Sequence, residues 1–204
     1  MGLRLPSPML ARSGALPSGD YSFELKWDGF RAIVSRNGGF RALSRRGWEM
    51  TPLLPELADL PDASVFDGEL VAFADGRPHF PLVCDRLLRK DASVALTYVV
   101  FDLLALNSEP LLDRPYRERR ALLETLDLGR GPWSVAETFD DGVALFAAVC
   151  DQGLEGVVAK RRSERYRSGE RRWIKVKNRA YWRYGEELAS LRRSLERAAA
   201  VAER

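Results

Sequence analysis

The sequence predicts an α+β protein with one main hydrophobic core. Short runs of alternating apolar and polar residues predict strands at 21–26, 30–36 and 39–44, and Asn37-Gly38-Gly39 is a strong hairpin signal between the last two. Leucines at helical spacing predict a helix over 51–60. The 204 residues, 46% of them hydrophobic, are enough to form one sizeable core.

Strands and helices are expected to alternate along the rest of the chain. Further strands are expected at 65–71, 97–104, 133–137, 155–161 and 173–178, and further helices at 80–90, 113–126 and 140–152. Residues 1–19 contain several prolines, which favour an extended lead-in. From Tyr181 a stripe of Leu and Ala predicts a helical tail over 181–204. The main domain is therefore expected to span 20–180.

Composition excludes several classes of protein. One histidine, His79, argues against a zinc site or a histidine-based catalytic triad. Two distant cysteines and the lack of a signal peptide or membrane span favour a reduced, cytoplasmic protein without a membrane partner. Residues 155–184 hold eleven Lys or Arg against three Glu, so this segment carries +8 within a net charge of +3. Such a basic segment favours a polyanionic partner.

Lys26 lies at the end of a predicted strand, directly before an Asp-Gly turn, in Glu24-Leu25-Lys26-Trp27-Asp28-Gly29-Phe30-Arg31. A lysine there can act as a nucleophile if it loses its proton. This requires lowering its pKa by roughly 3 units, about 4 kcal/mol, through burial, nearby cations or a metal. The alternative interpretation is an exposed lysine before a tight turn, and this short stretch alone does not decide between the two.

Other side chains point to phosphate and cation chemistry. Glu69 lies in an apolar strand, where a carboxylate needs a cation or a hydroxyl partner. Lys175 and Lys177 alternate on one strand face, which favours an anion between them. Arg45 follows a strand and offers a fork of donors to phosphate or ribose, although Arg-Arg-Gly is also an ordinary polar turn. Phe101 is either a core residue or a stacking platform for a base.

Taken in order from Pro8 to about Tyr184, these motifs resemble those of the covalent nucleotidyltransferase superfamily, specifically the adenylation domain of bacterial-type ATP-dependent DNA ligases. The motifs that carry the resemblance are Lys26-Trp27-Asp28-Gly29-Phe30-Arg31, Ser44-Arg45-Arg46-Gly47, Asp67-Gly68-Glu69, Phe101-Asp102, Glu155-Gly156-Val157-Val158 and Lys175-Val176-Lys177. Each is short, but the fixed order makes the signal strong.

The resemblance implies a role for each matched residue. Lys26 would be the adenylated nucleophile, Glu24 would contact the adenine edge and Arg31 the ribose or phosphate. Arg45 would contact phosphate, and Phe101 would stack on adenine.

The remaining motifs imply a metal and the α-phosphate. Glu69 would lie near the ribose and hold Mg²⁺ together with Glu155, while Lys175 and Lys177 would hold the α-phosphate. The implied cofactors are ATP and Mg²⁺.

The implied fold is an ATP-grasp-like nucleotidyltransferase domain of two packed antiparallel sheets flanked by helices. Ligases of this type continue into an OB-fold of about 100 residues. Only 27 residues follow Lys177, and they are expected to be helical, so no OB-fold is expected. The implied function is ATP-dependent adenylation for sealing nicks in double-stranded DNA during repair. The chain is expected to be a stand-alone adenylation domain, a piece of a longer ligase, or a protein that works with a partner supplying the OB-fold functions. The alternatives are an RNA ligase or capping-type nucleotidyltransferase, or a non-catalytic nucleic-acid-binding or partner module.

Overall fold

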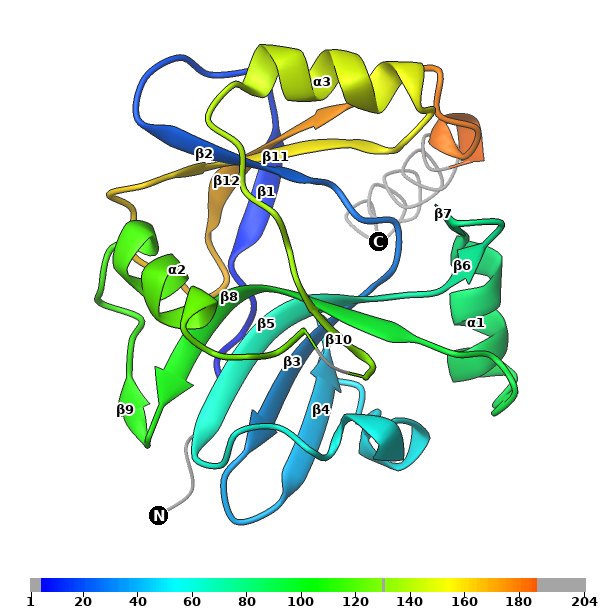
Figure 1. The fold of residues 1–204 in the computed structure, drawn as a ribbon, viewed down its shortest axis with the longest axis vertical. Coiled ribbons are helices and arrows are strands. Elements are labelled where there is room, and N and C mark those ends of the chain that lie inside the picture. Colours follow the sequence, from blue (N-terminus) through cyan, green and yellow to red (C-terminus); the bar gives the residue numbers. More distant parts are fainter. Residues whose placement is uncertain (1–4, 130, 187–204) are drawn as a thin grey trace, which may run out of the picture.

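Two β-sheets, one of four strands and one of six, form the body of the molecule, as the computed structural model shows (Figure 1). The structure describes residues 5–129 and 131–186. Residues 187–204, most of the predicted helical tail, lie outside the described residues. None of the helices in the described part of the chain has the length and hydrophobicity needed to cross a bilayer.

The strands and helices follow one another in this order: β1 Leu10–Ser13, β2 Tyr21–Leu25, β3 Phe30–Arg36, β4 Phe40–Ser44, the 3₁₀ turns η1 Thr51–Leu53 and η2 Pro55–Leu57, β5 Ser64–Val71, β6 Phe73–Ala74, β7 Arg77–Pro78, α1 Phe80–Leu88, β8 Thr97–Leu106, β9 Glu109–Pro110, α2 Tyr116–Glu124, β10 Trp133–Val135, α3 Gly142–Asp151, β11 Gly156–Arg161 and β12 Arg171–Lys177.

The α+β class with two sheets is confirmed, but the sheets are mixed rather than purely antiparallel. The four-stranded sheet has the order β1-β12-β11-β2, and β1 pairs with β12 in parallel. The six-stranded sheet has the order β10-β8-β5-β3-β4 with β9 attached to β8, and β10 pairs with β8 in parallel. Strand β1 lies within the predicted extended lead-in, where four residues at a sheet edge leave too short a pattern to recognise.

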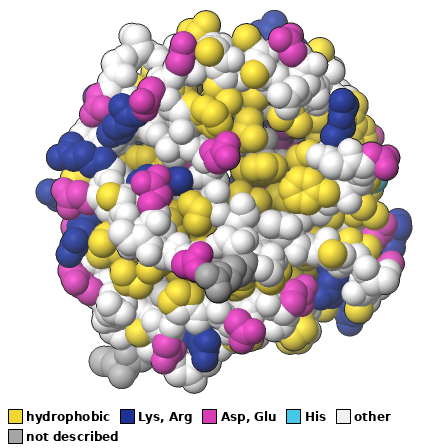
Figure 2. Space-filling view, in the orientation of Figure 1, with side chains coloured by type: hydrophobic (Ala, Val, Ile, Leu, Met, Phe, Trp, Pro, Cys, Tyr) yellow, Lys and Arg dark blue, Asp and Glu magenta, His cyan; other side chains and the backbone are white. Residues whose placement is uncertain are grey.

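Three apolar layers hold the sheets and helices together. Helix α3 covers the outer face of the four-stranded sheet and packs on Phe23, Val157 and Ile174 (Figure 1). A second cluster, which includes Phe101 and Trp173, fills the space between the sheets. A third lies on the other face of the six-stranded sheet. The face seen in Figure 2 has hydrophobic side chains over its middle and Lys and Arg mostly around its margins.

The prediction of a helix over 51–60 is wrong. The segment forms η1 and η2 instead, because Pro55 lacks a backbone N–H and its ring opposes a continuous helix. Leu54 separates the two turns with a non-helical φ of −132°. The expected core packing is nevertheless confirmed, since Leu54 and Leu57 are fully buried. The helix predicted over 113–126 is present but shorter, beginning after Pro115.

Candidate active site

A pocket of about 170 Å³ opens between the two sheets and ends at the predicted nucleophile. The pocket contains seven of the predicted site residues: Glu24, Lys26, Arg31, Arg45, Glu69, Phe101 and Lys175. A wider groove of about 610 Å³ continues from Lys26 past Lys175 and Lys177 toward Arg46 and Trp48. Glu155 lines a smaller recess on another side of Lys26. The structure therefore brings all nine predicted residues around one point.

The loop Lys26–Gly29 crosses from the four-stranded sheet to the six-stranded sheet, because β2 belongs to the first and β3 to the second. The Lys26 N–H donates to the Gly156 carbonyl at 2.9 Å. Gly156 must be glycine, since a Cβ there would lie 2.2 Å from the Val176 carbonyl oxygen. A Cβ on Gly29 would lie 2.1 Å from the Leu70 carbonyl oxygen. Close backbone contacts thus fix both ends of the loop.

An ion pair holds the side chain of Lys26. Its Nζ lies 2.5 Å from Glu155 Oε1, and Lys177 Nζ lies 3.7 Å from the same oxygen. Glu155 is almost fully buried, whereas Lys26 keeps 21% of its side chain exposed, toward the pocket and groove. The carboxylate favours the charged ammonium, so attack by Lys26 requires this pair to open.

Glu69 reaches the pocket from β5 beside Lys26 and Arg31. Burial raises its pKa to about 8; the charges of Glu155 and Asp67 add to the rise, and those of Arg31 and Lys26 oppose it. Glu69 therefore carries a proton at neutral pH in the free protein. The contribution of Glu155 to this rise also places the two carboxyl groups near each other.

The raised pKa predicts a pH-dependent stability. Unfolded Glu69 loses its proton near pH 4.5, whereas folded Glu69 keeps it to about pH 8. Between these values the folded state holds the extra proton, so this residue lowers the free energy of unfolding by at most about 1.4 kcal/mol per pH unit as pH rises. Between about pH 4.5 and 8, the free energy of unfolding, measured with urea, should fall less with rising pH, or rise more, for Glu69→Gln than for wild type. Parallel profiles for the two proteins would contradict a raised pKa for the Glu69 carboxyl group.

Arg31 is held mainly by protein groups. Its Nε and Nη2 bond both oxygens of the fully buried Asp67 at 2.5 Å, and Nη2 also donates to the Met9 carbonyl at 3.0 Å. The guanidinium lies 4.6 Å from the centre of the Phe101 ring. Phe101 belongs to the inter-sheet core and also lines the pocket, so its role in the core is confirmed and its stacking on a base stays a prediction.

Several cations converge on the open side of the pocket. Burial, together with repulsion from Arg171, Arg46 and Arg31, lowers the pKa of Arg45. Lys175 lines both the pocket and the groove. Like charges gathered in this way are unfavourable unless an anion lies between them.

The comparisons with known proteins agree with this geometry. A family model described as the ATP dependent DNA ligase domain matches residues 8–177. The chain belongs to this family. It is 36% identical to the SPbeta prophage-derived DNA ligase-like protein LigB of Bacillus subtilis, over 86% of this chain and 68% of that protein. It is 38% identical to DNA ligase C2 of Mycolicibacterium smegmatis, over 84% of this chain and 53% of that ligase.

A solved structure shows the same fold. The structure described as mycobacterial DNA ligase D complexed with ATP and MES matches with a TM-score of 0.74 and 36% identity, covering 84% of this chain and 60% of that one. The match extends over the adenylation domain of the ligase family. The chain thus spans about half to two thirds of these relatives.

Lys160 lines the pocket but was not predicted as a site residue. Lys160 is almost fully buried; its Nζ lies 2.7 Å from Glu24 Oε1 and donates to the Phe101 carbonyl at 3.0 Å. Tyr116 donates to the same Glu24 oxygen at 2.5 Å. Glu24 is therefore held at the deep end of the pocket by a buried cation and a hydroxyl. In the sequence, a lysine at the end of a strand gives no signal of burial.

Proposed function

We propose that this ligase-family chain uses ATP and Mg²⁺ to adenylate Lys26 and passes the AMP to the 5′-phosphate at a nick in double-stranded DNA. The observation that carries the proposal is the position of Lys26, which lies between a pocket lined by aromatic residues and a groove lined with lysine and arginine. The first suits a nucleobase, and the second suits phosphates.

The chemical step forms one bond and breaks another. Lys26 first loses a proton. Glu155 Oε1, which lies 2.5 Å from Lys26 Nζ, is positioned to accept it. The Nζ lone pair then attacks the α-phosphorus, the bond from that phosphorus to the β-phosphate oxygen breaks, and pyrophosphate leaves with the electron pair. A second proton leaves as the phosphoramidate forms. Lys175, Lys177 and Arg45 would balance the charge that develops on the phosphate oxygens.

Glu69 and Glu155 are the residues that would hold Mg²⁺. Carboxylate oxygens suit this ion, which binds through one or two carboxylates and keeps waters and substrate phosphates as its other ligands. A set of two carboxylates fits this pattern, and residues 5–129 and 131–186 contain no cluster of three or more His, Cys, Asp or Glu suited to a metal. When bound, Mg²⁺ would polarise the phosphate oxygens and neutralise part of their charge.

Two labels in ATP test the proposal. Radiolabel at the α-phosphate should stay on the protein through denaturing electrophoresis, whereas label at the γ-phosphate should leave as pyrophosphate. Retention of the γ-label would indicate phosphorylation instead. Addition of nicked DNA to the labelled protein should then move the label to the DNA; transfer only to nicked RNA would favour the RNA-ligase alternative. GTP in place of ATP tests a capping-type reaction.

Phe101 provides a separate prediction for nucleotide binding. Phe101→Leu keeps an apolar side chain in the inter-sheet core but removes the flat ring, so ATP affinity should fall by about 1–3 kcal/mol, the magnitude of a base stack. Equilibrium binding of ATP measures this loss, and thermal unfolding checks that the core is kept. Unchanged affinity would make Phe101 a core residue only.

We propose a cytoplasmic location, in keeping with Cys84 and Cys150, which are both free thiols.

A further inference from the structure

The segment that follows β12 returns to the nucleophile loop. This exit segment, Asn178–Arg183, begins at the buried Asn178, whose N–H donates to the Glu155 carbonyl at 2.9 Å and whose Nδ2 donates to the Leu154 carbonyl at 3.0 Å. The first residue of the segment is therefore hydrogen-bonded to the backbone of Glu155, whose side chain pairs with Lys26. From there it continues to the groove, where Arg183 is one of the lining residues.

Two side chains of the exit segment bond Asp28, in the middle of the nucleophile loop. Arg183 Nη1 pairs with both carboxylate oxygens of Asp28, and Tyr181 donates to Oδ2 at 2.7 Å. Asp28 is 6% exposed, so its charge depends on these partners rather than on water. The hydroxyl of Tyr181 is firmly protonated, because burial and Asp28 raise its pKa.

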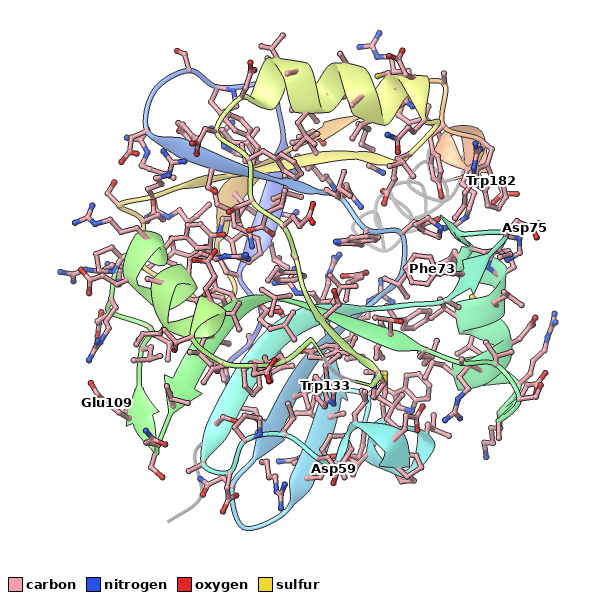
Figure 3. The ribbon with its side chains drawn as sticks, viewed as in Figure 1. Asp59, Phe73, Asp75, Glu109, Trp133 and Trp182 are labelled. Carbon is pink, nitrogen blue, oxygen red and sulfur yellow. The ribbon has the colours of Figure 1, made fainter. Side chains whose placement is uncertain are left out.

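The same exit segment contacts elements attached to the six-stranded sheet. The Arg183 guanidinium lies 3.8 Å from the centre of the Phe80 ring at the start of α1, and Trp182 stacks on His79 with ring centres 6.2 Å apart. Figure 3 shows Trp182 above Phe73 of the β6–β7 hairpin. Phe73 in turn meets Trp27 of the nucleophile loop edge to face at 6.2 Å. The segment thus joins both sheets beside Lys26.

These contacts decide where the loop lies. Residues 26–29 form neither helix nor strand, so no strand ladder fixes them between their two ends. The backbone contacts of Lys26 and Gly29 fix the two ends of the loop, and the side-chain contacts of Asp28 fix its middle. Because a misplacement of about 1 Å can slow a reaction about a hundredfold, the group that holds Asp28 affects attack by Lys26.

We propose that Arg183 is a positioning residue for Lys26: through Asp28 and Phe80 it fixes the nucleophile loop in the geometry required for adenylation. This role rests on the proposed function. It predicts a loss in the rate of the chemical step rather than in ATP binding, because Arg183 Nη1 is engaged by both oxygens of Asp28 and the residue does not line the pocket proposed for the nucleobase.

Single-turnover formation of the AMP adduct at saturating ATP tests the role, with ATP affinity measured separately. Arg183→Gln should slow adduct formation about tenfold to a hundredfold while ATP affinity stays within about twofold. Arg183→Lys, which keeps the charge but loses the planar fork, should give an intermediate rate. Asp28→Asn combined with Arg183→Gln should be no slower than the slower single variant, because both disrupt one contact.

Arg179→Gln is the matched control, since Arg179 is an exposed arginine of the same segment. Its rate should equal that of wild type. If Arg183→Gln unfolds, Tyr181→Phe serves instead, because it removes one hydrogen bond to Asp28, and it should slow the step with ATP affinity unchanged. A rate for Arg183→Gln equal to that of the control, or a loss confined to ATP affinity, would overturn the role of Arg183 alone. An absence of adduct on wild type would overturn the proposed function and this role together.

Discussion

Lys26→Arg is expected to form no covalent AMP adduct. An arginine guanidinium stays protonated throughout the accessible pH range and has no free lone pair for attack on phosphorus. The variant keeps the positive charge beside Glu155, so the ion pair at the site and the binding of ATP should largely persist. Label from the α-phosphate, followed by denaturing electrophoresis, measures the adduct, and equilibrium binding measures ATP affinity.

Lys90→Arg is the control for this substitution, because Lys90 is exposed and lines neither the pocket nor the groove. It should form the adduct at the wild-type rate. An adduct of similar yield on Lys26→Arg would assign the nucleophile to another residue.

Arg31→Ala is expected to lower the free energy of unfolding by about 3–5 kcal/mol, the usual cost of leaving one member of a buried ion pair without its partner. The exposed fraction of Asp67 is 0%, and after the substitution its carboxylate would keep the hydroxyl of Tyr166 at 2.6 Å but no longer the guanidinium. Urea denaturation with linear extrapolation measures the loss. The resemblance to ligases implies a ribose or phosphate contact for Arg31, and a purely ligand-binding arginine would show no such loss.

Arg41→Ala tests whether the effect comes from burial. Arg41 pairs with Glu49 at 3.0 Å, and both side chains are about half exposed. Such a surface pair contributes about 0–1 kcal/mol. If Arg31→Ala costs no more than Arg41→Ala, the buried Arg31–Asp67 pair between β3 and β5 stabilises the fold no more than a surface pair does.

The convergence of the site could be predicted from the sequence because its motifs follow one another in the order typical of ATP-dependent DNA ligases. Strand spacing alone places Lys175 and Lys177 on one face, and both line the groove in the structure. The partners of these residues could not be predicted. Lys160, Tyr116 and Arg183 lie far from Lys26 in the chain, and their burial arises only when the sheets pack.

In the fold, too, some elements could be predicted from the sequence and others depend on tertiary contacts. Long strands such as β8 were clear from their apolar runs, whereas β1 is too short and depends on its pairing with β12. The segment 51–60 has leucines at helical spacing, but its prolines limit it to 3₁₀ turns that bury the same leucines. The hydrophobic pattern thus identified which residues are buried, whereas the prolines determined which secondary structure buries them.

Peptide mapping by mass spectrometry after incubation with ATP and Mg²⁺ tests the central claim most directly. The protein must first be shown to be folded and free of AMP. We expect a gain of one AMP, located on the peptide that contains Lys26 and absent from Lys26→Arg. An AMP on a different residue, or no gain in mass on the folded protein, would contradict the assignment of Lys26 as the adenylated nucleophile.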